Sequence, residues 1–329
     1  MKKFIVLGSN SFSGSNFINF LLKKNCRVVG VSRSKQYNNV YLPYKNSANL
    51  NLFKFYKLNI NTNLKKFLAM AKDFRPNYIV NYIAQGMVSE SWLTPEDWYK
   101  TNVLAQVKIY RELSNFKFIK KFIHVTTPEV YGNIKNKTKE NFNFNPSTPY
   151  AISRATLDMH LNKYYEEFRL PIVFTRTANV YGPCQQLYRI IPKAILSARL
   201  NRKINLHGRG LSKRSFIYID DVSTATYLIS IKGRVGSTYH ISTNNIISIR
   251  NLVKMISAMT KIKFKKLVSI TQDRIGKDSI YNLSSKKIRK ELNWKPKTNL
   301  YKGLIETLKW IDSNITFLKQ HKFHYIHKK

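Results

Sequence analysis

Two short segments of this chain carry residue types that together could move a proton and a hydride. The first places Thr127 and Glu129 directly after an apolar run that ends at Val125, which predicts the exit of a buried strand. The second begins at Tyr150, after a stretch rich in Asn, Ser and Pro that predicts the start of a helix, and continues to Arg154. A carboxylate and a phenol at one edge of a sheet could serve as acid and base. We therefore predict a catalytic site formed by Thr127, Glu129, Tyr150 and Arg154.

Length and composition indicate a reduced, globular protein. The 329 residues, 43% of them hydrophobic, are enough for a substantial core. No apolar run approaches the roughly 18–20 residues that a membrane span needs. Cys26 and Cys184 lie far apart and have no metal-like spacing, which fits a reducing compartment. We expect a cytoplasmic protein without a metal or a membrane partner.

The charge of the chain is unusually positive, with 57 Lys and Arg against 17 Asp and Glu and a formal net charge of +40. Such a charge can indicate a nucleic-acid or anionic-membrane partner. The basic residues are scattered rather than gathered in one arm, so a general composition bias is the favoured interpretation. We expect no specific nucleic-acid partner. For His321, His324 and His327 in the basic tail, a solvated terminus is favoured over a metal site.

Strands and helices alternate along the first half of the chain. Apolar runs predict strands at 4–7, 27–32, 53–58, 78–83, 121–126 and 172–177, and helical periodicity predicts helices near 17–22, 64–72, 96–113 and from 150. Later segments predict strands at 215–219 and 239–242 and helices near 192–200, 221–231, 249–260, 285–292 and 300–311. This order predicts an α/β fold, a Rossmann-like doubly wound parallel sheet with a smaller C-terminal substrate-binding region. We divide the chain into 1–178, a dinucleotide-binding domain with the catalytic residues, an interleaved sugar-nucleotide region at 179–315, and a basic tail at 316–329.

The first strand-turn-helix unit predicts a dinucleotide site. Gly8 and Gly14 keep the spacing of a glycine-rich turn, with Ser11 at the middle position. The second strand ends at Ser32 and Arg33 without an acidic residue. A ribose 2′-hydroxyl favours Asp or Glu there, whereas a 2′-phosphate favours Arg. The cofactor is therefore NADP or NAD, with NADP favoured.

With these features the sequence resembles the extended short-chain dehydrogenase/reductase superfamily, and within it the nucleotide-sugar 4,6-dehydratases of the dTDP-glucose and GDP-mannose types. The resemblance covers about residues 3–312. It rests on six ordered segments. Near the cofactor these are the glycine turn that includes Phe12, and the pair formed by Ala84-Gln85 and residues 101–103. The others are the T-S-E-x-Y-G-like stretch 127–132, the stretch 176–183 (R-x-x-N-x-Y-G-P), which binds phosphates in the family, and the stretches 214–222 and 273–278, which bind the nucleotide in the family.

The resemblance also implies which residues bind the ligands. The expected cofactor-binding residues are Gly8, Ser11, Phe12, Gly14, Ser32, Arg33, Asn59, Ile60, Ala84, Gln85, Asn102, Thr126, Tyr150 and Arg154. The expected residues for a nucleotide-diphosphate sugar substrate are Asn179, Arg214 and Arg274. The family further implies a homodimer, commonly formed through the Tyr150 helix.

The implied reaction oxidises C4 of a hexose, eliminates water across C5–C6 and returns the hydride to C6. Tyr150 would be the base for the 4-hydroxyl, and a nearby cation together with the oxidised nicotinamide would lower its pKa. The family places Lys where this chain has Arg154, and the dTDP-glucose type places Asp where it has Pro128. Proline cannot donate a proton, so Glu129 would act at C5 and then protonate the leaving hydroxyl. Thr127 would hydrogen-bond the 4-oxygen.

Other functions remain open at this point. The same scaffold supports UDP-glucuronate decarboxylases, 4-epimerases and reductases. Epimerases usually lack a carboxylate at the Glu129 position, whereas the decarboxylases carry a similar stretch. A non-catalytic polyanion-binding protein on this fold is the remaining alternative.

Overall fold

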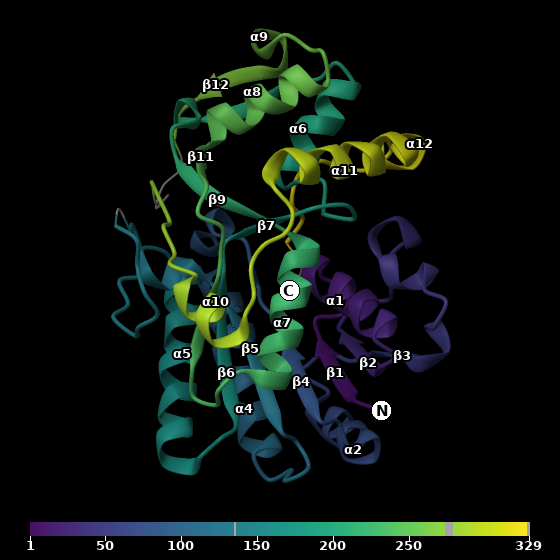
Figure 1. Cartoon of the computed structure of the whole chain (residues 1–329), viewed down its shortest axis with the longest axis vertical. Coiled ribbons are helices and arrows are strands. Elements are labelled where there is room, and N and C mark those ends of the chain that lie inside the picture. Colours follow the sequence, from purple (N-terminus) through teal and green to yellow (C-terminus); the bar gives the residue numbers. More distant parts are fainter. Residues whose placement is uncertain (135, 274–278, 328–329) are drawn as a thin grey trace.

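A seven-stranded parallel sheet forms the centre of the structure (Figure 1). The computed structural model describes residues 1–134, 136–273 and 279–327. The strand order is β10-β6-β5-β4-β1-β2-β3. The strands are β1 (Lys3–Leu7), β2 (Arg27–Ser32), β3 (Phe53–Lys57), β4 (Tyr78–Asn81), β5 (Lys121–Thr126), β6 (Ile172–Thr177) and β10 (Thr238–Ile241). The predicted doubly wound fold is confirmed.

Helices cover both faces of this sheet, which is why inner strands such as β1 and β4 are largely apolar runs, whereas the edge strand β3 is only partly buried. One face packs against α1 (Phe12–Lys23), α7 (Ile219–Lys232) and α10 (Lys286–Leu292). The other packs against α2 (Leu64–Phe74), α4 (Ala105–Leu113) and α5 (Pro149–Phe168).

The strand order reverses at β1, which pairs with β2 on one side and with β4 on the other. In open α/β sheets, ligands bind in the crevice outside the carboxyl ends of the strands at such a reversal. The turn after β1 and the segment after β4 meet there. They approach so closely that a Cβ on Gly8 would lie 3.0 Å from the carbonyl carbon of Tyr82. The fold therefore places a ligand site at the end of β1.

The helix predicted at 96–113 is divided into three parts. α3 (Pro95–Tyr99) leads into a π-helical turn at Lys100–Leu104, and α4 follows. The turn buries Thr101 and Asn102, and Asn102 bonds Ser153 on α5 and the backbone of Gln85 in the segment after β4. Wider turns of this kind occur frequently at functional sites.

A second region lies above the carboxyl edge of the sheet in Figure 1 and has a core of its own. Its helices are α6 (Ile190–Arg199), α8 (Ile249–Met259), α9 (Phe264–Leu267), α11 (Leu300–Ser313) and α12 (Ile315–Leu318). Its strands are β7 (Asn179–Tyr181), β8 (Ile204–His207), β9 (Lys213–Tyr218), β11 (Ile246–Ser248) and β12 (Val268–Thr271). They form a three-stranded and a two-stranded sheet. Of these strands only β9 was predicted, because the others are short and two are only partly buried.

The chain crosses between the two regions more than once. β10, α7 and α10 all follow residue 178 in the sequence, yet they complete the large sheet and cover one of its faces. The division at residue 178 remains a prediction.

The C-terminal tail is solvated only in part: His321 and His324 are exposed, as expected, whereas Tyr325 and His327 pack against the rest of the molecule. The Tyr325 ring lies 5.5 Å from that of Tyr188. The His327 ring stacks at 5.0 Å on Trp98, and its Nε2 lies 2.7 Å from Asp97 Oδ2. Within residues 1–134, 136–273 and 279–327, no cluster of three or more His, Cys, Asp or Glu could hold a metal ion, and no helix is long and apolar enough to cross a membrane.

Candidate active site

A cavity of about 1140 Å³ opens at the carboxyl edge of the large sheet, beneath the second region. Most of the residues predicted for the site line it: Gly8, Ser11, Phe12, Ser32, Arg33, Asn59, Ile60, Ala84, Gln85, Thr126, Thr127, Glu129, Tyr150, Arg154 and Asn179. These residues come from segments between positions 8 and 179, which the topology brings to one edge. The predicted cofactor, catalytic and substrate residues therefore share one cavity.

Three predicted residues lie outside the lining of this cavity in the described part of the chain. Gly14 lies behind the turn, where a Cβ would come within 2.4 Å of the Gly8 carbonyl oxygen. Asn102 is buried and bonds the backbone of Gln85 in both directions, at 2.8 and 3.1 Å. Arg214 lies over the Tyr281 ring at 4.3 Å. Arg274, the remaining prediction, lies outside the described residues.

The turn after β1 has the geometry of a phosphate-binding loop. Gly8 has a φ of +79°, a conformation that side chains rarely adopt, and the absence of a Cβ at Gly14 lets α1 begin directly against the turn. Ser11 caps α1 by accepting the Gly14 N–H at 3.1 Å. The N-terminus of α1 thus faces the cavity and favours an anionic group there.

Buried polar atoms of the cavity-lining residues fit a cofactor rich in hydroxyl groups. Asn10 Oδ1, Asn61 Oδ1 and Thr126 Oγ1 are inaccessible and have no hydrogen-bond partner in the described structure. Leaving such atoms unpaired costs about 1–3 kcal/mol each, so a ligand with matching groups would be stabilised. Together with the glycine turn, these atoms fit a dinucleotide.

Tyr150 lies one residue into α5, and three local contacts fix its position. Thr148 caps the helix by accepting the Ala151 N–H at 3.2 Å. Ser91 Oγ accepts the Tyr150 N–H at 3.1 Å, and Ser153 Oγ donates to the Tyr150 carbonyl at 2.7 Å. The phenol therefore has a defined location in the cavity wall.

The protein environment makes Tyr150 a weaker acid than an ordinary tyrosine. Burial raises the pKa of Tyr150, and the nearby Glu129 raises it further. The positive charge of Arg154 and a hydrogen bond with Thr127 act in the opposite direction but do not prevail. In the protein alone Arg154 therefore does not bring the pKa of Tyr150 below its ordinary value, and the expected preference for phenolate rests on the charge of the oxidised nicotinamide as well.

Glu129 lies on a 3₁₀ turn, Pro128–Tyr131, and Thr127 caps the start of this turn directly after β5. Pro128 is suited to the first position of this turn because its N–H would have no partner there. Thr127 Oγ1 accepts the Glu129 N–H at 3.4 Å. This turn directs Thr127 and Glu129 into the same cavity as Tyr150.

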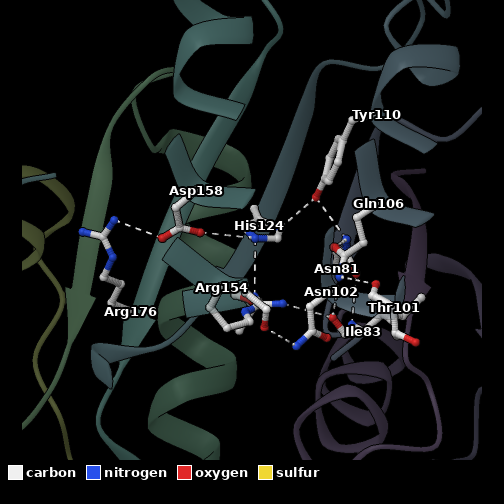
Figure 2. Close-up of polar contacts among 12 residues, drawn as sticks. Asn81, Ile83, Thr101, Asn102, Gln106, Tyr110, His124, Arg154, Asp158 and Arg176 are labelled. Carbon is white, nitrogen blue, oxygen red and sulfur yellow. Dashed lines mark hydrogen bonds and ion pairs between the residues drawn. The ribbon is translucent and has the colours of Figure 1, made fainter. Parts of the chain in front are cut away.

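Arg154 has 1% of its surface exposed, and its guanidinium is directed at the ends of two strands (Figure 2). It donates to the carbonyl of Ile83 at 3.4 Å and to that of Val125. Its Nη2 also lies 3.4 Å from His124 Nε2. Arginine can span these two carbonyls because its donors form a planar fork, which the ammonium of lysine lacks.

A chain of buried hydrogen bonds fixes the His124 ring beside Arg154 (Figure 2). Asn81 Oδ1 accepts the Ile83 N–H at 3.0 Å, so its amide nitrogen is the group that donates to the Tyr110 hydroxyl at 3.1 Å. Tyr110 then donates to His124 Nδ1 at 3.0 Å, which leaves the ring proton on Nε2. Burial lowers the pKa of His124, against the effect of Asp158, and so keeps the ring neutral.

Asp158 completes this network between the neutral His124 ring and the Arg176 guanidinium. Its Oδ1 lies 3.5 Å from His124 Nε2 and its Oδ2 lies 3.1 Å from Arg176 Nη2, with both charged side chains fully buried. Burial alone would raise the pKa of Asp158, but His124, Arg176 and Arg154 hold it below its usual value. Arg176 also contacts Tyr131 and donates to the Asn141 carbonyl at 2.8 Å. It therefore anchors β6 to α5, although its sequence segment suggested phosphate binding.

Several cavity-lining residues were not predicted. Arg189, Lys193, Asn205 and His207 come from the entry to α6, α6 itself and β8, and tail residues 320–322 and 324–326 line the cavity as well. Asn205 and His207 alternate along β8, so they share one face, but the strand itself was not predicted. Arg189 and Lys193 are spaced i and i+4, the one pattern that could have indicated a basic helix face.

The cavity and the sheet together define a dinucleotide-dependent enzyme of the short-chain dehydrogenase/reductase class. Residues 5–307 match the family model of GDP-mannose 4,6 dehydratase. The chain is 33% identical over 242 residues to the human dTDP-D-glucose 4,6-dehydratase, covering 72% of this chain and 69% of the relative.

Solved structures agree with this match. The Bacillus anthracis dTDP-glucose 4,6-dehydratase, solved in complex with NAD, is 27% identical with a TM-score of 0.87, and the match covers 97% of this chain and 99% of the other. The Thermotoga maritima UDP-glucose 4-epimerase, solved with UDP-glucose, is 26% identical with a TM-score of 0.85 and covers 95% and 99%. The chain belongs to the GDP-mannose 4,6-dehydratase family, and it is an NAD(P)-dependent lyase.

Replacing the central carboxylate should destabilise the protein strongly. Asp158→Asn leaves the buried Arg176 without its counter-charge, so we expect the free energy of unfolding to fall by about 3–5 kcal/mol. Urea denaturation followed by circular dichroism measures this change. Asp312→Asn, which breaks the exposed Arg199–Asp312 pair, is the matched control and should cost under about 1 kcal/mol. Equal losses in the two variants would contradict the structural role of Asp158.

Proposed function

We propose that this protein is a nucleotide-hexose 4,6-dehydratase that converts a dTDP-glucose-like substrate into the 4-keto-6-deoxy sugar. The observation that carries the proposal is the convergence of Tyr150, Thr127 and Glu129 in one cavity behind a phosphate-binding turn. The relatives named above as dTDP-glucose dehydratases support this substrate class. The bound nicotinamide would supply reversible hydride acceptance.

Tyr150 takes the proton of the sugar 4-hydroxyl in this mechanism. Its phenol is buried and bonded to Thr127, whose hydroxyl can also steady the 4-oxygen as a ketone forms. The raised pKa of Tyr150 limits the phenolate at neutral pH, and Arg154 opposes that rise. The guanidinium of Arg154 donates to the carbonyls of Ile83 and Val125, so the charge that lowers the pKa of Tyr150 has a fixed position in the cavity wall.

Glu129 carries out both proton transfers of the elimination. Once C4 is a ketone, the C5 proton becomes acidic, and the Glu129 carboxylate can remove it. Pro128 has no proton to give, so the protonated Glu129 is the acid for the departing 6-hydroxyl. One side chain thus serves as base and then as acid.

We assign the ligand contacts by position in the cavity. Cofactor contacts come from the turn after β1 and from the ends of β2, β3, β4 and β5, and Asn179 lies on the substrate side. Arg214, which lies outside the lining of the cavity, and Arg274, which lies outside the described residues, remain proposed substrate residues. We place the enzyme in the cytoplasm.

A 4-epimerase is the second candidate because the Thermotoga maritima neighbour in fold has that activity. Epimerisation needs the 4-hydroxyl base but no acid–base group for C5 and C6. Glu129 in the cavity therefore favours elimination.

Removing the carboxylate tests this assignment. Glu129→Gln should reduce water loss from a nucleotide hexose by at least about a thousandfold, because the amide is neither base nor acid. Mass spectrometry of the product follows the reaction, and fluorescence titration should show cofactor binding unchanged. Glu166→Gln, on the exposed side of α5, is the control and should keep full activity. Unchanged water loss in Glu129→Gln would remove this residue from the mechanism.

The pH dependence tests the role of Arg154. Because the reaction needs deprotonated Tyr150, kcat should rise with pH through the pKa of that group. Arg154→Met removes a charge that lowers this pKa, so the rising limb should move to higher pH, with about a tenfold loss of rate at pH 7 for each unit. Arg154→Lys keeps a positive charge and should stay closer to the parent limb. If kcat of Arg154→Met rose over the same pH range as kcat of the parent enzyme, an electrostatic role of Arg154 would be excluded.

We also propose a homodimer through the outer faces of α4 and α5. Ile152 and Met159, two turns apart on α5, are 39% and 49% exposed, and Leu104 at the start of α4 is 59% exposed. Exposed apolar side chains on two packed helices are suited to burial against a second copy of the same helices.

Light scattering measures this assembly directly. Met159→Glu should halve the molar mass at micromolar concentration, because it puts a charge in the centre of an apolar interface. Tyr301→Glu changes a 57% exposed residue of α11 and should leave the mass unchanged. A Met159→Glu variant with the parent mass would place the interface elsewhere.

A further inference from the structure

Residues 321–327 of the tail, which we call the strap, lie against the rest of the molecule through every second side chain. Phe323, Tyr325 and His327 are half-buried, whereas the residues between them are exposed. In an extended segment successive side chains point to opposite sides, so these three share the inner side. Each of them contacts a different part of the protein.

The near end of the strap is held by aromatic side chains on the side of β2. Phe323 packs against the core of the second region. The centroid of the His321 ring lies 4.3 Å from that of Phe317 on α12 and 6.2 Å from that of Tyr41, which follows β2 in the chain. Figure 1 shows α12 on this side of the large sheet. The near end is therefore part of a packed core.

The far end of the strap is attached to α3, on the side of β4. The His327 ring stacks on the fully buried Trp98, and its Nε2 donates to Asp97 Oδ2 at 2.7 Å. α3 leads into the π-helical turn, where Asn102 bonds the backbone of Gln85 in the segment after β4. Both of these attachments belong to one side chain of the strap.

Between its two ends the strap crosses the carboxyl end of β1. In the sheet, β1 lies between β2 and β4, so a segment that runs from one side to the other passes the turn after β1. A dinucleotide places its pyrophosphate at that turn. Residues 322 and 324–326 line the same cavity as the turn. The strap therefore spans the expected position of the dinucleotide.

Tyr325 lies in the middle of this crossing. Its ring centroid is 5.5 Å from that of Tyr188, which precedes α6 in the second region. Burial raises the pKa of Tyr325, and the charges of Arg33 and Arg189 oppose that rise. Since Arg33 follows β2 and Arg189 caps α6, the phenol lies between the cofactor wall of the cavity and the second region.

We propose that the strap is a gate for the dinucleotide, whose far end detaches from Trp98 and Asp97 when the cofactor enters or leaves. The far end opens because two contacts of one side chain hold it, whereas the near end belongs to a packed core. This inference rests on the dinucleotide site of the proposed enzyme and adds control of cofactor exchange to it. The proposed reaction returns the hydride within each turnover, so the enzyme can retain its cofactor behind a closed strap.

A gate has a kinetic signature that a ligand contact lacks. Entry and exit both need the open strap, so closing it slows association and dissociation by a similar factor. A side chain that only touches the bound cofactor slows dissociation alone.

Stopped-flow fluorescence of the full chain measures both rates, with NADH and NADPH as probes. Association is followed after mixing, and dissociation is followed after an excess of NAD or NADP displaces the bound probe. His327→Ala removes both attachments of the far end, so both rates should rise at least about fivefold, and the Kd should change less than either rate.

Two further substitutions locate the effect at α3. Asp97→Asn keeps the shape of the side chain but removes its charge, so it should raise both rates by about two- to threefold. Glu96→Gln, which changes the neighbouring exposed carboxylate, is the matched control and should leave both rates unchanged. Asp97→Asn combined with His327→Ala should exchange the probe no faster than His327→Ala alone, because both act through one contact.

The outcomes distinguish this inference from the proposed function. Parent rates in His327→Ala would overturn the gate, and so would faster dissociation without faster association. Either result would leave the proposed dehydratase intact. If neither NADH nor NADPH binds the parent chain, the dinucleotide site itself is wrong, and the proposed function fails with it.

Discussion

The buried carboxylate of Asp158 is the interaction on which the catalytic edge of the sheet depends. It lies on α5, two turns after Tyr150, and it compensates the charge of Arg176 on β6 while facing His124 on β5. Burying ions without partners costs several kcal/mol each, so these elements are stable together only in this arrangement. The same arrangement fixes the distance between Tyr150 and the end of β5, where Thr127 and Glu129 begin.

Arg154 links this buried network to the cavity. Its guanidinium donates to the carbonyls that follow β4 and precede the end of β5, and the neutral His124 ring lies against it. A flexible ammonium would not join both strands in this way. The arginine therefore combines two roles, a positive charge behind the Tyr150 phenol and a bridge between two strand ends. Pro128 provides no acidic side chain on the turn after β5, so Glu129 is the residue of this turn that can act as an acid.

The sequence predicted the parts of the fold that have strong local patterns. The strands of the large sheet are buried on both faces, so they appear as continuous apolar runs such as 4–7 and 78–81, and the turn after β1 is defined by its glycines. β7 and β11 have three residues each and are partly exposed, so periodicity could not identify them. The contacts of His327 with Trp98 and Asp97 could not be predicted either, because they join residues far apart in the sequence.

The same limit applies to the site. Residue type and spacing identified Tyr150, Glu129 and Arg154, but not the direction of the guanidinium or the pairing of Arg176 with Asp158. Those depend on which side chains the folded sheet brings together. The effect of burial on the pKa of Tyr150 could not be predicted from the sequence either, because predicting it requires the solvent exposure of the side chain in the folded state.

The most direct test of the account follows one hydrogen atom. A nucleotide hexose carrying deuterium at C4 is incubated with the enzyme, and the product is analysed by mass spectrometry and NMR. The account predicts loss of one water, deuterium at C6 of the same molecule, and no net reduction of the cofactor. Deuterium retained at C4 without water loss, or loss of carbon dioxide in place of water, would contradict it.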